Sequence, residues 1–269
     1  MTRAGLSPVL NLLRLDGNFY GATELGGPTF IGKFSFNNYG TVFRMTPDGA
    51  LSNLFSFNGT NGYVPTALIQ SPDGNLYGTT SKGGPQFRGS GGDGTVFRLT
   101  TNGVFTTLAV FNRTNGSSPL SLMQAADGNF YGTTSQGGSN LTGTGYGTIF
   151  KMTPAGKLTS LFSFNGTNGA SPRYGPLVQA ADGSFYGTTY LGGESNRGTI
   201  FRFDIAPSRP PVHLEFQTLN NQLVLSWTNA NFTLQSAPAI TGPFNNIPGA
   251  TSPYTNSLTA PQQFFRLAD

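Results

Sequence analysis

Chemistry in this chain of 269 residues would have to come from carboxylates, because the other reactive side chains are scarce. There is no cysteine, and the single histidine is His213. The sequence therefore offers no thiolate nucleophile and no histidine-centred triad in its main part, and we predict neither a metal nor a cofactor. Glu24, Asp93 and Glu194 lie in or beside glycine-rich loops. A converging pair of them would serve as acid and base or as calcium ligands; the alternative is solvated loop charge.

Four other carboxylates recur inside one motif, which takes the forms LDGNFYGAT, PDGNLYGTT, ADGNFYGTT and ADGSFYGTT. Asp-Gly suits the positive φ angles of tight hairpins, so we predict that these aspartates form turns. A catalytic pair needs two different environments, and four equivalent positions supply one environment four times. The four aspartates are Asp16, Asp73, Asp127 and Asp182.

Two further motifs follow the aspartate motif in a fixed order. GT(V/I)F(R/K) occurs four times, at 40–44, 94–98, 147–151 and 198–202, and (L/F)xxLxxFxxTNG occurs at 51–62, 105–116 and 158–169. A fixed period above 50 residues indicates a repeat architecture.

Each repeat is predicted to form four short antiparallel strands. In the second repeat these are Thr66–Gln70, Asn75–Thr80, Thr95–Leu99 and Val104–Phe111. Four strands in about 54 residues match the blade of a β-propeller, whereas solenoid repeats are usually shorter and stack parallel strands. We therefore predict an all-β, β-propeller-like array of four blades, three four-stranded and one three-stranded. The array either closes into a ring or forms a partly open arc.

The composition changes after the fourth repeat. We predict a propeller-like domain over 1–204, a proline-rich linker over 205–211 and a small β-sandwich module over 212–269, with five or more short strands around Trp227. The first repeat begins with its first strand at 5–8. The fourth repeat ends after its third strand, so its fourth strand is absent. An open strand edge predicts association with another chain.

The three linked motifs closely resemble the GloVer-type tandem repeat over about residues 5–204. The resemblance implies a propeller-like fold and a secreted or cell-surface location, as for exported bacterial proteins with varied surface anchors. It implies no established enzymatic activity, so it carries over no functional residues. No signal-peptide or anchor pattern flanks the repeats, so export is an expectation from the family alone. The hairpin resembles, more loosely, the blades of sensor propellers and of a lyase that opens streptogramin antibiotics.

The charge and hydropathy of the sequence limit the kinds of partner that the protein is expected to bind. The 15 basic residues are scattered, with a net charge of +4, and do not form the clustered patch of a nucleic-acid-binding protein. No apolar run approaches the roughly 20 residues of a membrane span. We predict neither nucleic acid nor a membrane span, and expect a glycan, peptide or surface protein as the partner.

The loops between the second and third strands are the predicted binding face. Their lengths are 12, 9, 8 and 4 residues, and variation confined to one face of a repeat fold usually marks the binding surface. Aromatic and arginine side chains dominate recognition sites, although aromatic rings also pack loops. The main hypothesis is a non-enzymatic binding module; the alternatives are a lyase or glycan-active hydrolase and a structural surface component. Candidate residues in these loops and in the turns between repeats are Tyr39, Tyr63, Phe87, Arg88, Arg113, Tyr146, Arg173, Tyr174 and Arg197, together with Phe30, Phe34 and Phe36.

Overall fold

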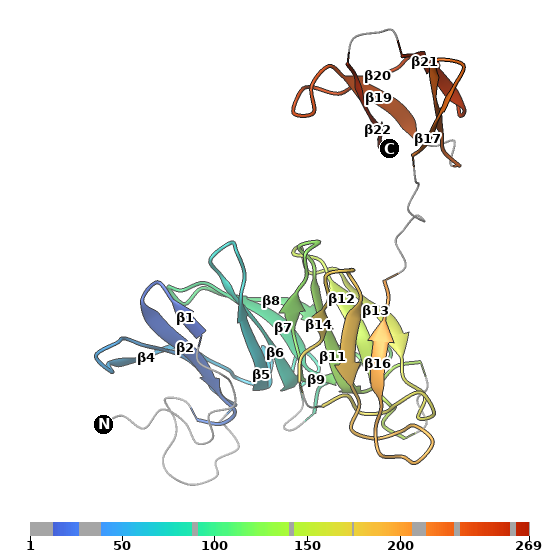
Figure 1. The fold of residues 1–269 in the computed structure, drawn as a ribbon. Coiled ribbons are helices and arrows are strands. Elements are labelled where there is room, and N and C mark those ends of the chain that lie inside the picture. The colour runs from blue at the N-terminus through green and yellow to red at the C-terminus, as the bar shows by residue number, and fades with distance from the viewer. Residues whose placement is uncertain are drawn as a thin grey trace. The chain divides into compact units, whose positions relative to one another are not determined.

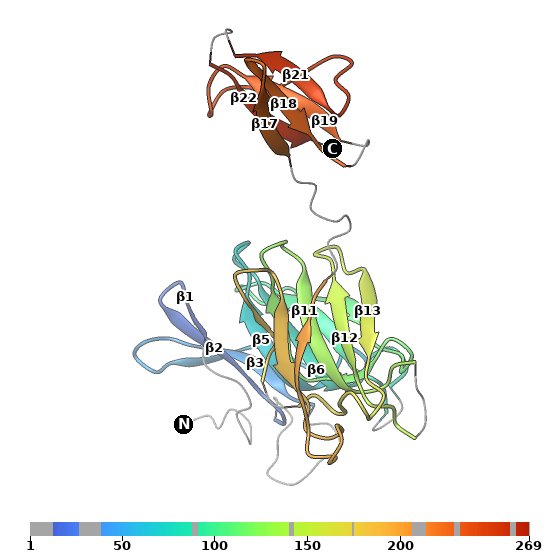
Figure 2. The ribbon, with the colours of Figure 1, turned by 45° about the vertical axis from the view of Figure 1, so that its right-hand side comes forward.

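The described part of the chain folds into strands, turns and loops. The computed structural model describes residues 13–26, 39–87, 91–139, 143–173, 175–205, 214–228, 232–258 and 262–268, and these contain no helix, so the all-β prediction is confirmed. Two compact units are present, Met1–Asp204 and Ile205–Asp269. Figures 1 and 2 show both units.

The first unit contains four antiparallel sheets, one for each sequence repeat, called here repeat sheets 1 to 4 (Figure 1). Sheet 1 consists of β1 (Leu13–Leu15), β2 (Asn18–Thr23), β3 (Thr41–Met45) and β4 (Leu51–Ser56). Sheet 2 consists of β5 (Tyr63–Gln70), β6 (Leu76–Lys82), β7 (Thr95–Leu99) and β8 (Phe105–Val110). Sheet 3 consists of β9 (Ser117–Pro119), β10 (Met123–Gln124), β11 (Phe130–Gln136), β12 (Thr148–Met152) and β13 (Leu158–Ser163). Sheet 4 consists of β14 (Val178–Gln179), β15 (Phe185–Thr188) and β16 (Ile200–Phe203).

Sheet 3 differs from the predicted four strands because its first strand is broken. β9 and β10 both pair with β11, so the sheet contains five strands. At the break, the Thr133 N–H donates to Ser121 Oγ at 3.0 Å instead of to a strand carbonyl. The two pieces together follow the path that the unbroken β5 takes in sheet 2.

Aromatic side chains of the hairpins pack between neighbouring sheets. The Tyr77 ring of sheet 2 stacks on Phe130 of sheet 3 with centroids 4.4 Å apart, and Tyr131 contacts Phe185 of sheet 4 at 4.7 Å. Tyr77, Phe130, Tyr131 and Phe185 are all buried. At these two junctions, a tyrosine of one hairpin packs on a phenylalanine of the next hairpin, which explains why the sequence repeats these aromatic residues.

The repeated threonines and glycines hold the second and third strands together. Buried threonine hydroxyls pair across these strands in every sheet, at 2.8–2.9 Å. The glycine after the tyrosine has no room for a side chain: a Cβ on Gly78 would collide with the Ala67 carbonyl oxygen and the Phe97 ring. The backbone of β6 thus lies directly against the neighbouring strand and that ring.

The second unit contains two three-stranded sheets that contribute to one core. Their orders are β17-β18-β21 and β20-β19-β22. Leu225, Trp227 and Leu234 are buried together in this core. The predicted linker residues 206–211 and His213 lie outside the described residues. The strands are β17 (Glu215–Leu219), β18 (Gln222–Ser226), β19 (Thr233–Ala237), β20 (Asn245–Asn246), β21 (Tyr254–Ser257) and β22 (Phe264–Ala268).

Candidate binding face on the loops

The variable loops and the turns between sheets share one edge of the array, which we call the loop face. Each turn that leaves one sheet is hydrogen-bonded to the glycine pair of the next sheet. The Gly84 N–H donates to the Gly59 carbonyl at 2.9 Å, Gly138 to Arg113 at 2.7 Å, and Gly193 to Gly166 at 2.9 Å. The loops that follow these glycine pairs therefore start beside the turns.

Three of the candidate residues meet in an aromatic cluster where sheets 1 and 2 adjoin. Tyr39 precedes β3, Tyr63 begins β5, and Phe87 follows β6. The Tyr39 ring lies edge-on to Tyr63 at 5.1 Å and to Phe87 at 5.3 Å, and Tyr63 and Phe87 are 6.4 Å apart. All three rings are half-buried, so each keeps part of its surface open to solvent. The Lys82 ammonium lies 5.8 Å from the centre of the Tyr63 ring.

A polar cluster occupies the corresponding place where sheets 2 and 3 adjoin. Asp93 holds the position before Gly94 that Tyr39 holds before Gly40. The Ser117 hydroxyl donates to Asp93 Oδ1 at 2.6 Å, and Arg113 Nε lies 3.8 Å from the same oxygen. The Arg113 side chain is 65% exposed, so this ion pair contributes little to stability and leaves the guanidinium accessible.

Tyrosine and arginine recur where sheets 3 and 4 adjoin. Tyr146 lies against Gly166 of the turn between the sheets, where a Cβ would stand 3.3 Å from its ring. Arg173 Nε donates to Ser171 Oγ at 2.8 Å, and its guanidinium lies 5.7 Å from the centre of the Tyr190 ring. The structure thus brings the candidate residues together in separate groups, one at each junction.

The remaining candidates are isolated or lie outside the described residues. Arg197 and Glu194 are exposed in the short loop of sheet 4, and Glu24 is half-buried after β2. Among the described residues, no three acidic or histidine side chains gather as a metal site requires. The candidates Phe30, Phe34, Phe36, Arg88 and Tyr174 lie outside the described residues.

The backbone at the start of sheets 2, 3 and 4 has no signal in the sequence. Val64, Ser118 and Ser171 occupy equivalent places and have φ angles of +56°, +55° and +54°. Left-handed backbone is costly for residues other than glycine, and most of all for a β-branched valine. Each N–H is held by the preceding sheet: those of Val64 and Ser118 donate to the carbonyls of Tyr39 and Asp93 at 3.1 and 2.9 Å. The variable residue of each loop thereby anchors the next sheet.

The four repeated aspartates lie at the opposite edge, in the hairpins between the first two strands of each sheet. Asp73 Oδ1 accepts the backbone N–H of Asn75 at 3.0 Å, and Oδ2 accepts the Tyr77 hydroxyl at 2.8 Å. Asp127 makes the same two bonds to Asn129 and Tyr131, at 3.0 and 2.8 Å. Asp73 and Asp127 therefore each tie their hairpin to the tyrosine that packs on the next sheet.

The hydrogen bonds keep these carboxylates ionised. Burial raises the pKa of Asp127, but hydrogen bonds from Asn129, Tyr131 and Lys151 outweigh it and lower the pKa to about 2. The Lys151 ammonium lies 3.1 Å from Asp127 Oδ2. Hydrogen bonds from Ser184 lower the pKa of Asp182. A carboxylate held in this way is an acceptor in a turn and a poor proton donor at neutral pH.

The repeated sheets and their loop face define a β-propeller-like tandem-repeat protein. The chain belongs to the Gloeobacter/Verrucomicrobia repeat family, whose sequence profile matches residues 7–234. The resemblance drawn from the three linked motifs is therefore confirmed. The match spans all four repeat sheets and ends in β19 of the second unit.

Solved structures of similar fold come from several kinds of protein. The extracellular domain of a hybrid two-component system from B. thetaiotaomicron is 15% identical, with a TM-score of 0.43; the match covers 96% of this chain and 35% of that one. The periplasmic gluconolactonase of Pseudomonas aeruginosa is 15% identical, with a TM-score of 0.40 and coverages of 91% and 70%. Puromycin hydrolase is 12% identical, with a TM-score of 0.44 and coverages of 93% and 40%. The chain thus spans about a third of the first of these proteins.

A search of curated protein sequences finds no match to this chain. In the part of the chain that the structure describes, no helix is both long and apolar enough to cross a membrane.

Proposed function

We propose that this protein is a non-enzymatic binding module, placed outside the cell or on its surface, whose loop face recognises a glycan or a peptide. The observation that carries the proposal is the cluster of Tyr39, Tyr63 and Phe87, which gathers three half-buried rings from the loops of two sheets. The surface location rests on family membership.

The chemistry of the loop face suits recognition. Aromatic rings that are fixed by their neighbours offer large apolar surfaces at a low entropic cost on binding, and tyrosine adds a hydroxyl for hydrogen bonding. Lys82 and Arg113 place cations beside the rings of one junction and in the polar cluster of the next. A ligand that spans two sheets would therefore meet apolar, hydrogen-bonding and charged groups in turn.

The state of Asp93 favours binding over catalysis. Its carboxylate is engaged by the Ser117 hydroxyl and by Arg113, both of which belong to the start of the next sheet or the turn before it. These two contacts fasten two neighbouring sheets together, which gives Asp93 a structural role. The enzyme hypothesis for Glu24, Asp93 and Glu194 is tested by turnover of any glycan that the protein binds.

A glycan array probed with the full chain tests the proposal. We expect binding that falls by about tenfold or more in Tyr63→Ala and in Phe87→Ala, as for hot-spot aromatics. Tyr186→Ala is the matched control, because Tyr186 is an exposed tyrosine on sheet 4 away from the cluster. Absence of binding by the folded protein would overturn the proposal for a glycan and leave a peptide as the ligand to test, and an equal loss in Tyr186→Ala would overturn the assignment to the aromatic cluster.

A second candidate, self-assembly, is favoured by the outer face of sheet 4. Ile200 is 85% exposed and Val178 is 61% exposed, although equivalent residues of sheet 3 are covered by sheet 4. The face that matches it is the front of sheet 1, where Phe19 holds the place of Phe130 and Phe185 but is only half-buried. We propose a second copy of this chain as the occupant, with sheet 1 of one copy packed on sheet 4 of the other.

Sedimentation velocity over a range of concentrations tests the assembly. We expect the wild type to self-associate and Ile200→Glu to remain monomeric. Val104→Glu is the matched control, since Val104 is 58% exposed next to β8 and belongs to neither face. A wild type that remains monomeric at the highest concentration contradicts this candidate.

A further inference from the structure

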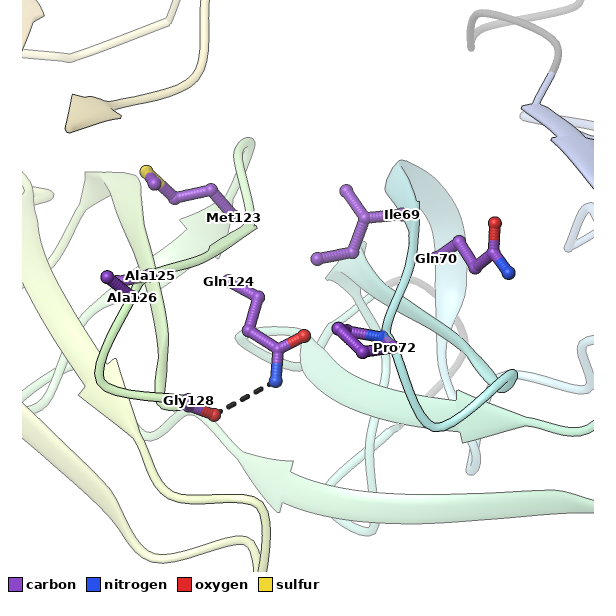
Figure 3. Close-up of a pocket in the computed structure, with 8 residues that line it drawn as sticks. All are labelled: Ile69, Gln70, Pro72, Met123, Gln124, Ala125, Ala126 and Gly128. Atoms are coloured by element: carbon purple, nitrogen blue, oxygen red, sulfur yellow. Dashed lines mark hydrogen bonds between the residues drawn. The ribbon is translucent and has the colours of Figure 1, made fainter. Parts of the chain in front are cut away.

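A pocket of about 490 Å³ lies between sheets 2 and 3 at the hairpin edge, away from the loop face (Figure 3). Its walls include Ile69, Gln70 and Pro72, at the end of β5 and in the hairpin that follows, and Met123 and Gln124 of β10. A pocket of this volume falls in the range of small-molecule sites. None of the described residues that line it is charged, so the pocket suits a neutral molecule.

Gln124 presents an unsatisfied acceptor to this pocket. Its Nε2 donates to the Gly128 carbonyl at 3.0 Å, which determines which end of the amide is the oxygen. The other atom, Oε1, is buried and finds no hydrogen-bond partner among the described residues. Figure 3 shows this oxygen turned towards Pro72. A buried acceptor without a donor destabilises the protein until a donor arrives.

The junction between sheets 3 and 4 shows how the protein satisfies the equivalent oxygen. Gln179 takes the place of Gln124 there, and its Oε1 accepts the backbone N–H of Ala126 at 2.9 Å. Ala126 precedes Asp127 as Pro72 precedes Asp73. Proline has no N–H, so the same bond cannot form to Gln124. The orphan acceptor therefore occurs at the junction where proline replaces the residue that would donate.

The geometry points to a second binding site, in which a neutral hydroxyl-bearing molecule of about monosaccharide size donates an O–H to Gln124 Oε1. Ile69 and Pro72 supply apolar surface for the C–H face of a pyranose ring. The site is separate from the loop face and stands whether or not the loop face binds a glycan.

The methionine methyl groups report on this site directly. The chain has four methionines; Met123 lines the pocket and Met152 is buried in the core. Full-length protein labelled with ¹³C at its methionine methyls is titrated with methyl glycosides of glucose, galactose, mannose and rhamnose. We expect at least one sugar to shift the Met123 signal and to leave Met152 unchanged. If no sugar shifts Met123 at saturating concentration, water alone fills the pocket and the inference is wrong.

Three variants test the role of the orphan oxygen. Gln124→Met removes the acceptor at similar volume, and we expect the affinity to fall about fivefold to tenfold. Pro72→Ala restores the N–H that Ala126 supplies at the next junction, so we expect a similar fall together with a higher Tm. Gln179→Met is the matched control: it removes the satisfied oxygen, lowers the Tm and leaves the affinity unchanged. Wild-type affinity in Gln124→Met or in Pro72→Ala would overturn the assignment.

Discussion

Repeat sheets 3 and 4 share the aspartate motif and the GT(V/I)F(R/K) motif but stand in different surroundings. Tyr131 of sheet 3 is 1% exposed, whereas its equivalent in sheet 4, Tyr186, is 38% exposed. The contrast is larger for the isoleucines, at 1% for Ile149 and 85% for Ile200. Among the described residues, sheet 3 has a neighbouring sheet on each face, and sheet 4 has one on a single face.

The difference shows that the motif encodes an interface rather than a core. Tyr131 is buried because Phe185 of the next sheet packs on it, and Tyr77 is buried by Phe130 in the same way. Each sheet alone leaves its apolar face uncovered, and stacking neighbours buries a continuous core, as in other repeat architectures. The same substitution should therefore cost much in sheet 3 and little in sheet 4.

The isoleucine pair should show the largest contrast. Ile149→Ala removes a fully buried side chain, and we expect the free energy of unfolding to fall by about 2–5 kcal/mol. Ile200→Ala removes an exposed side chain, and we expect a change within about 0.5 kcal/mol. Urea unfolding of both variants at low protein concentration measures the two values. Equal losses would show that sheet 4 is covered in solution.

The glycine pair should show a smaller contrast. A Cβ on Gly132 would collide with the backbone carbonyl oxygen of Ser121 and with the Phe150 ring. We expect Gly132→Ala to cost about 1–3 kcal/mol, because a backbone atom of a packed sheet cannot move aside. A Cβ on Gly187 would meet only the side chains of Phe201 and Leu177, so Gly187→Ala should cost less.

The unfolding midpoint in urea measures this contrast as well. A cost for Gly187→Ala as large as that for Gly132→Ala would mean that the Phe201 ring is held as firmly as the buried Phe150 ring. In that case the open face of sheet 4 would not loosen the side chains beneath it.

Local chemistry made much of the fold predictable from the sequence. Asp-Gly marks the hairpins, and alternating threonine and aromatic residues mark the strands, so β6, β7 and β8 lie within two residues of their predicted bounds. β21 has no such signal, because its residues YTNS are mostly polar and follow a proline. The all-β class depends on turn chemistry, which acts over a few residues.

The grouping of the site residues was less predictable, because it depends on contacts between repeats. The sequence places Tyr39, Tyr63 and Phe87 in loops, but their meeting requires the turn of one sheet to lie on the glycine pair of the next. The orphan oxygen of Gln124 arises from the absence of an N–H at Pro72, a residue 52 positions earlier in the chain. Neither relation has a local sequence signal.

Asp127 and Asp182 should show the smallest contrast in stability, and they should show it only at acidic pH. The folded protein lowers the pKa of Asp127 from 3.8 to about 2, so its contribution to stability is present above pH 3.8 and is lost as the pH falls towards 2. We expect Asp127→Asn to flatten the fall in Tm over this range. Asp182 is also held below its usual pKa, chiefly by Ser184, but it lies in the exposed hairpin of sheet 4.

The Tm measured from pH 4.5 to pH 2 in low salt compares the two variants, each against the wild type at the same pH. We expect Asp182→Asn to change the acid slope less than Asp127→Asn does, because Asp127 also accepts the hydroxyl of a tyrosine that is buried between two sheets. Tyr186, the equivalent in sheet 4, is exposed. An equal change in slope would show that each hairpin aspartate acts only within its own turn. A larger change for Asp127→Asn would show that the turn and the junction between sheets are energetically linked.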